Sequence, residues 1–144
     1  MIYKKLLIIV TLSFLLMTIS DAKTKKKTIN QVYNEVRKMK IQDVELKKIS
    51  DGIYPGSFTY LTSTLEVEVI IKDHEIIKIS IIKGAVTKQG KKAEKIIDAV
   101  IKKQTANVDA ITGATTTSKG LLKSIENALT GIGSSEIEPT YEVN

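Results

Sequence analysis

Residues 65–81 read Leu-Glu-Val-Glu-Val-Ile-Ile-Lys-Asp-His-Glu-Ile-Ile-Lys-Ile-Ser-Ile, and this stretch sets the architecture of the chain. Apolar and polar side chains alternate along residues 65–72 and again along residues 77–81, which is the pattern of strands with one buried face. The polar segment 72–75 supplies the turn, so a β-hairpin over about residues 65–82 is predicted. His74 lies in that turn, and we interpret it as a surface turn residue, not as a ligand or a base.

The segments on either side of the hairpin predict the rest of the fold. Upstream, residues 51–56 contain two glycines and a proline, which indicates a turn before a strand that carries Phe58 and Tyr60 on one face. Downstream, a loop over residues 84–90 precedes amphipathic helices at about 91–104 and 117–130. The prediction is an α+β fold in which a small antiparallel sheet packs with these helices.

Composition excludes several kinds of chemistry. The 144 residues contain no cysteine and one histidine, so disulfides, iron-sulfur clusters, zinc fingers and histidine-pair metal sites are excluded. The only histidine lies in a predicted turn, so no Ser-His-Asp triad is expected. We therefore expect no catalytic residues of this type and no metal site.

The first residues predict export. Lys4 and Lys5 precede an apolar run over residues 6–19, and Ser20-Asp21-Ala22 places small residues where a signal peptidase cuts. The prediction is a signal peptide over residues 1–22, cut after Ala22, and a mature protein in the periplasm or at the cell surface. An uncleaved membrane anchor is the alternative, although the run is short for a span.

The segment 23–49 is predicted to be a basic arm with a short helix at about residues 30–40. Thr28 and Gln31 have the spacing of a capping box, and the narrow apolar stripe of the helix favours loose docking. Residues 23–48 hold nine bases and three acids, whereas the rest of the chain from residue 49 holds eleven bases and twelve acids. The arm could contact an anionic membrane or cell-wall polymer, or be a solvated tether. Nucleic-acid binding is disfavoured.

Residues 109–120 read Asp-Ala-Ile-Thr-Gly-Ala-Thr-Thr-Thr-Ser-Lys-Gly and form the candidate site. Five hydroxyl residues surround Gly113 and Ala114 directly before an amphipathic helix. The free N–H groups of a helix start favour a phosphate, and small residues let it approach closely. Helix capping by Thr117 or Ser118 is an alternative role for these hydroxyls. Asp109 could hold the turn by accepting backbone hydrogen bonds.

The segment 109–118 resembles the signature of the FMN-binding domain family, which includes exported flavin subunits of sodium-pumping NADH:quinone oxidoreductases and related ferredoxin-dependent complexes. Residues 51–56 are similar to the opening turn of that family, and the hairpin is similar to the strand pair that follows. These features place an FMN-binding domain at residues 50–131, before a tail over residues 132–144 that is predicted to be mobile.

The resemblance implies a cofactor and its attachment. In many members a threonine of the Ser/Thr-Gly-Ala-Thr core carries FMN through a phosphoester, which a magnesium-dependent flavin transferase installs from FAD. The matching acceptor here is Thr115. The other residues implied in the site are Asp109, Thr112, Gly113, Ala114, Thr116, Thr117 and Ser118.

The resulting hypothesis is an exported electron carrier that exchanges electrons with a membrane system and is not itself an independent enzyme. Tyr54, Phe58 and Tyr60 are the aromatic candidates for stacking on the flavin ring, although aromatic residues on strands are commonly core. Two alternatives are open. The same domain could bind FMN without a covalent bond, or the basic arm could make the protein an envelope-binding module.

Overall fold

The structure is a computed structural model that describes residues 27–137. The predicted signal peptide and its cleavage site lie outside these residues. Within the described part, no helix is long and apolar enough to cross a membrane. The elements in chain order are α2 (Ile29–Lys38), a 3-10 turn (Leu46–Lys48), β1 (Gly52–Tyr60), β2 (Ser63–Lys72), β3 (Glu75–Lys83), α3 (Lys88–Ala93), α4 (Ile96–Lys103), α5 (Thr115–Thr130) and β4 (Ser134–Ile137).

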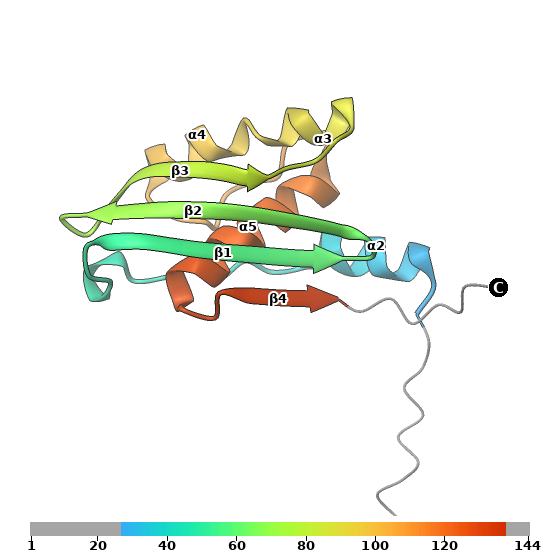
Figure 1. Cartoon of the computed structure of the whole chain (residues 1–144). Helices are drawn as coiled ribbons and strands as arrows, with labels where there is room; N and C mark the ends of the chain where they lie inside the picture. Colours follow the sequence, from blue (N-terminus) through green and yellow to red (C-terminus); the bar gives the residue numbers. More distant parts are fainter. Residues whose placement is uncertain (1–26, 138–144) are drawn as a thin grey trace, which may run out of the picture.

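The four strands form one sheet in the order β3-β2-β1-β4 (Figure 1). The pairs β1–β2 and β2–β3 are antiparallel, as predicted, but β4 runs parallel to β1. The sheet is therefore mixed, because the chain crosses from β3 through the helices before it returns to the edge of β1. The predicted α+β class is confirmed.

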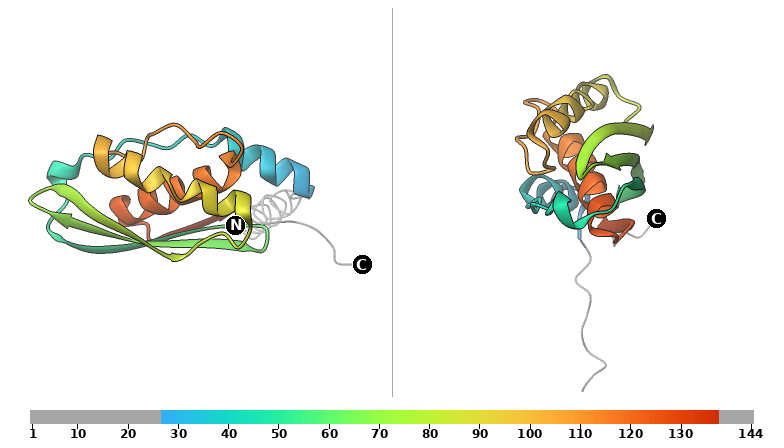
Figure 2. Two further views of the ribbon diagram at one scale, coloured as in Figure 1. Left: turned by 90° about the horizontal axis from the view of Figure 1, so that it is seen from above. Right: turned by 90° about the vertical axis from the view of Figure 1, so that its left-hand side faces the viewer.

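The helices lie on one face of the sheet, and α5 runs beneath its centre against β1 and β2 (Figure 2). One continuous core fills the space between the two layers. Its fully buried members include Phe58, Leu65, Val67, Val69, Ile71, Ile76, Ile96, Val100, Leu121, Leu122 and Ile125. The alternating apolar residues of β2 thus form the buried face that the sequence predicted.

The segment 51–56 is a strand and not the predicted turn, because β1 begins at Gly52. A Cβ at Gly56 would lie 2.1 Å from the backbone oxygen of Ser124, so this glycine permits close contact with α5. Pro55 is tolerated because β4 pairs with β1 only from Ser57 onward, which leaves Pro55 on a free edge.

The predicted hairpin is confirmed, with one change in its second strand. A register shift between Ile70 and Ile71 turns Ile76 inward, where it is 1% exposed, and leaves Ile77 50% exposed. The simple alternation predicted for residues 77–81 is therefore wrong at Ile77. The turn residue His74 has φ 62°, and its Nδ1 lies 2.9 Å from the carbonyl oxygen of Ile49.

The predicted helix over residues 91–104 is two helices, α3 and α4. The first begins at Lys88, inside the predicted loop, because the Thr87 hydroxyl caps it by accepting a hydrogen bond from the Gly90 N–H at 3.0 Å. The second ends at Gln104, whose φ is 55°. The Gln104 side-chain amide accepts a hydrogen bond from the Ile76 N–H and donates one to the Ile76 carbonyl oxygen. It therefore satisfies backbone groups at the edge of β3 that no strand of the described residues pairs with.

Helix α2 confirms the predicted helix and its capping box between Thr28 and Gln31. The predicted loose docking is wrong, because Val32 and Val36 are both 0% exposed in the common core. Two valines one helical turn apart bury enough apolar surface to fix a short helix. The packed body therefore begins before residue 50 and includes part of the predicted arm.

The predicted mobile tail is wrong for residues 134–137, which form β4. The buried Asn127 side chain holds this strand, because its Nδ2 donates to the Ser57 oxygen and to the Ser135 hydroxyl, both at 2.7 Å. The Gly133 N–H also donates to the Asn127 carbonyl oxygen at 3.1 Å. The rest of the predicted tail, residues 138–144, lies outside the described residues.

Candidate functional site

The predicted site residues lie where the chain turns from α4 into α5. We call residues 112–118 the entrance turn. Helix α5 begins at Thr115, two residues before the predicted start, and its N-cap is Ala114, which makes no side-chain capping bond. The alternative in which Thr117 or Ser118 caps the helix is therefore wrong. The first N–H groups of α5 are left to other acceptors.

Backbone and side-chain bonds fix the shape of the entrance turn. Gly113 has φ 79°, a conformation that favours glycine, and the Ala114 N–H donates to the Ile111 oxygen at 2.9 Å. The Ser118 hydroxyl accepts a hydrogen bond from the Ile111 N–H at 3.1 Å. Lys92 on α3 donates to the Thr112 oxygen at 3.3 Å. The entrance turn is thus held by bonds within its own segment and by Lys92 from α3.

Two predicted roles change with this geometry. Ser118 is 0% exposed, and its hydroxyl accepts the hydrogen bond from the Ile111 N–H, so it holds the loop. Asp109 is exposed, and within residues 27–137 its side chain makes no hydrogen bond to the turn. The hydrogen bond that was predicted to come to Asp109 from the backbone of the turn goes to the Ser118 hydroxyl instead.

The hydroxyls along the first turn of α5 differ in their partners. Thr116 Oγ1 accepts a hydrogen bond from Arg37 Nε at 3.1 Å. Thr117 shares a hydrogen bond with the Tyr60 hydroxyl. The Thr115 hydroxyl has no partner within the described residues, and Thr115 is half-buried. Among the hydroxyls of residues 115–118, that of Thr115 is therefore left for a ligand. The Thr112 hydroxyl also has no partner within the described residues, but Thr112 lines neither cavity.

Two neighbouring cavities open at the entrance turn. The first, of about 340 Å³, is lined by Arg37, Thr87, Gln89, Gly90, Gly113, Ala114, Thr115, Thr116 and Thr117. The second, of about 320 Å³, lies between Tyr33, Tyr60, the loop after β3 and the β1–β2 turn. Thr87, Thr116 and Thr117 line both cavities, so the two form adjoining compartments.

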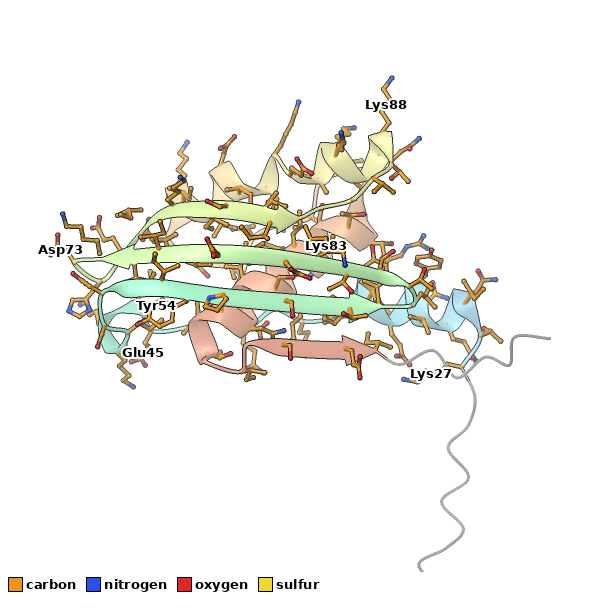
Figure 3. The ribbon with its side chains drawn as sticks, viewed as in Figure 1. Lys27, Glu45, Tyr54, Asp73, Lys83 and Lys88 are labelled. Atoms are coloured by element: carbon orange, nitrogen blue, oxygen red, sulfur yellow. The ribbon has the colours of Figure 1, made fainter. Side chains whose placement is uncertain are left out.

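The surroundings of the first cavity are basic. Arg37 approaches from α2, and Lys92 approaches from α3, which also carries exposed Lys88 and Lys91. In Figure 3, Lys83 and Lys88 lie at this end of the molecule, whereas Glu45 and Asp73 lie at the opposite end. Within the described residues there is no group of His, Asp or Glu that could hold a metal ion. The basic residues around the first cavity favour a negatively charged ligand.

The aromatic residues at the second cavity are not those that the sequence singled out. Phe58 is 2% exposed and belongs to the core, and Tyr54 bonds the Ser50 oxygen away from both cavities. Tyr60 does line the cavity, and burial raises the pKa of its phenol while the bond with Thr117 lowers it. Sequence reasoning missed Tyr33, whose ring meets the Tyr60 ring edge-on at 6.3 Å between centroids.

Arg37 was missed for the same reason as Tyr33. Both lie on α2 four residues apart, and residues at this spacing share one helix face. The predicted helix already contained this pair, but no sequence signal showed which partner the face would meet. The pairing of α2 with the entrance turn is a tertiary feature.

The fold and the site together define a small α+β domain with a basic, hydroxyl-rich anion site at the start of a helix. The model of the FMN-binding domain family matches residues 61–130. Residues 61–130 are therefore similar to the FMN-binding domains of this family, which supports FMN as the ligand. No curated protein matches the chain.

The residues present fit FMN as the cofactor. The phosphate finds a helix start with free N–H groups, a glycine at positive φ and a guanidinium beside the cavity. The flat ring finds a compartment with two tyrosines next to it. When bound, FMN supplies the capacity to accept and donate electrons.

Proposed function

We propose that this protein is an exported electron carrier whose FMN is joined to Thr115 by a phosphoester. The observation that supports this proposal best is the state of the Thr115 hydroxyl. It lies on the first cavity and has no partner within the described residues, whereas Thr116, Thr117 and Ser118 are each engaged. A hydroxyl without a protein partner is free to become an ester oxygen.

The attachment step proposed here uses FAD and a magnesium-dependent flavin transferase. The Thr115 oxygen attacks the phosphorus on the FMN side of the pyrophosphate, and a new P–O bond forms there. The P–O bond to the bridging oxygen breaks, AMP leaves, and the threonine proton passes to a base of the transferase. No electron is gained or lost by the flavin in this step.

Thr115 is the first residue of α5, where both steric and electrostatic conditions suit the ester. Gly113 and Ala114 have little or no side chain beside the phosphate. The positive end of the α5 dipole and the Arg37 charge stabilise the remaining negative oxygen. This placement supports Thr115 over Thr112, which does not line the cavity.

The second cavity would then hold the isoalloxazine ring. It adjoins the first cavity through Thr87, Thr116 and Thr117, so a ligand anchored at Thr115 can extend into it without leaving the protein surface. Tyr33 and Tyr60 contribute aromatic surface, and Val86, which is 93% exposed, lies at the rim. An open rim suits a carrier, because electrons must pass to a partner.

A covalent bond suits a flavoprotein outside the cytoplasm. A cofactor that dissociates there is diluted, so a permanent bond replaces binding affinity. The electron donors and acceptors would belong to a membrane electron-transfer system, and the predicted export signal supports that placement.

The proposal is tested by producing the full chain in a host with and without the flavin transferase. With the transferase, the intact mass should rise by one FMN less one water, and flavin absorbance should stay with the acid-precipitated protein. Thr115→Ala should abolish acid-stable flavin, and the control Ser134→Ala, which removes an exposed hydroxyl outside both cavities, should keep it. A colourless wild-type protein of unmodified mass would overturn covalent attachment.

Non-covalent FMN binding is the second candidate, because the cavities and the Arg37 charge would serve a free phosphate equally well. Under this alternative, Thr115→Ala weakens FMN binding but flavin is released from the wild-type protein by acid. Absorbance of the supernatant after acid precipitation separates the two possibilities.

A further inference from the structure

Helix α2 lies upstream of the matched residues 61–130, yet it lines both cavities of the site. Val32 and Val36 bury its inner face in the core, and the capping box between Thr28 and Gln31 stabilises its first turn. The remaining face carries Tyr33 toward the second cavity and Arg37 toward the first. A segment outside the matched region is thus part of the site wall.

The Arg37 guanidinium is held at the first turn of α5. Its Nε donates to Thr116 Oγ1 at 3.1 Å, which places the charged group next to the residue that follows Thr115. Within residues 27–137, no carboxylate forms a salt bridge with Arg37. A guanidinium has five donors in a planar fork, so the bond to Thr116 leaves others for an anion.

Building on the proposed FMN site, we propose that Arg37 binds the FMN phosphate and that α2 thereby selects phosphorylated flavin over riboflavin. Thr116 acts as a positioning residue for Arg37, because its hydroxyl accepts the hydrogen bond that orients the guanidinium. A planar guanidinium matches phosphate oxygens and forms charge-assisted hydrogen bonds, which are stronger than neutral ones.

The chain offers a matched control for the charge of Arg37. Lys38 is the next residue on α2, is exposed and does not line either cavity. Arg37→Gln and Lys38→Gln each remove one positive charge from the same helix. Any difference between these variants therefore reports the position of the charge and not the net charge of the protein.

The experiment is a fluorescence titration of the full chain, produced without the transferase, with FMN and with riboflavin. Arg37→Gln should raise the Kd for FMN about ten-fold or more, which is the effect expected for a lost hydrogen bond to a charged group. The Kd for riboflavin should stay unchanged, because riboflavin lacks the phosphate. Lys38→Gln should leave both constants unchanged at moderate salt.

Two further variants separate phosphate binding from a structural role. Arg37→Lys keeps the charge but loses the fork, so its FMN affinity should lie between those of the wild type and Arg37→Gln. Thr116→Val should weaken FMN binding less than Arg37→Gln, because the guanidinium keeps its charge and loses only the partner that orients it. Circular dichroism melting curves of the variants should match that of the wild type.

Each other outcome contradicts a defined part of the account. Equal losses for FMN and riboflavin in Arg37→Gln would overturn the phosphate assignment and indicate a structural role. Equal effects of Arg37→Gln and Lys38→Gln would overturn it in favour of general electrostatics. A wild-type chain that binds neither flavin, and is not flavinylated with the transferase, would overturn the proposed function as well.

Discussion

Helix α5 has two regions of opposite character. Its entrance turn, residues 112–118, offers hydroxyls to two open cavities, and Thr115 there has no partner within the described residues. Its buried body, residues 120–129, contacts the sheet so closely that Leu121, Leu122 and Ile125 are 0% exposed. One helix therefore contributes both to the candidate site and to the core.

Both regions contain a glycine, but the glycine serves packing in the buried body and backbone conformation in the entrance turn. In the buried body, Gly120 allows close packing, because an added Cβ would lie 2.6 Å from Leu65 Cδ1 and that side chain would have to shift. In the entrance turn, an added Cβ at Gly113 would meet only Lys92 Nζ at 4.0 Å, so glycine there serves the backbone angle and leaves space for a ligand. Changes in the body should affect stability, and changes in the turn should affect flavin.

The largest effect on stability is expected where the sheet meets the buried body. Gly56→Ala places a Cβ against the Ser124 backbone oxygen, which cannot move without shifting α5. The free energy of unfolding should fall by about 3 kcal/mol in urea titrations. Gly52→Ala is the control on the same strand, because its nearest atom is the Tyr54 ring at 3.4 Å. Similar stabilities for the two variants would contradict the close packing.

Asn127→Asp should have the next largest effect, at the far end of the buried body. The carboxylate cannot donate to the Ser57 oxygen, so this partly buried hydrogen bond is lost, and the bond with Ser135 persists only with the hydroxyl as the donor. The free energy of unfolding should fall by about 2 kcal/mol at neutral pH. The exposed Asn34→Asp is the control and should change it by less than about 0.5 kcal/mol. Equal effects would show that Asn127 does not hold β4.

Gly113→Ala tests the entrance turn and should have a smaller effect. The cost is the positive φ alone, so the free energy of unfolding should fall by about 1 kcal/mol. Gly113→Asn should recover part of this loss, because asparagine tolerates positive φ. Chemical denaturation of the three proteins gives the comparison. A loss as large as that of Gly56→Ala would mean that the turn is packed like the body.

The smallest effect concerns the loop that leads to the entrance turn. Hydrogen bonds from Thr105 and Asn107 lower the pKa of Asp43, which ties this loop to the segment after α2. A lowered folded-state pKa means that the contribution of Asp43 is present above its unfolded pKa and is lost as pH falls through the folded value. Asp43→Asn should therefore flatten the loss of thermal stability below about pH 4, and the exposed Asp98→Asn should not.

The sequence predicted those parts of the fold that rest on local patterns. The hairpin follows from the alternation of β2, and α2 follows from its capping box, because both signals depend on neighbours in the chain. The break between α3 and α4 and the pairing of β4 were missed. The Thr87 cap that starts α3 is a local signal that was not recognised, whereas the pairing of β4 depends on Asn127, whose partner Ser57 lies far away in the sequence.

The sequence predicted which contiguous residues form the site, but not which residues of other elements lie around them. The hydroxyl run and Gly113 could be found because they are contiguous, and the family resemblance rests on the same residues. Arg37 and Tyr33 could not be found, since only the docking of α2 brings them to the entrance turn. Which hydroxyl has no protein partner also depends on contacts far apart in the chain.

The central claim is that Thr115 carries the flavin. The most direct measurement is peptide mapping by mass spectrometry of the wild-type chain produced with the flavin transferase. The account predicts that fragment ions place one FMN on the Thr115 hydroxyl and none on Thr116, Thr117 or Ser118. Flavin on any of these three residues, or a fully unmodified peptide from a protein produced with active transferase, would contradict it.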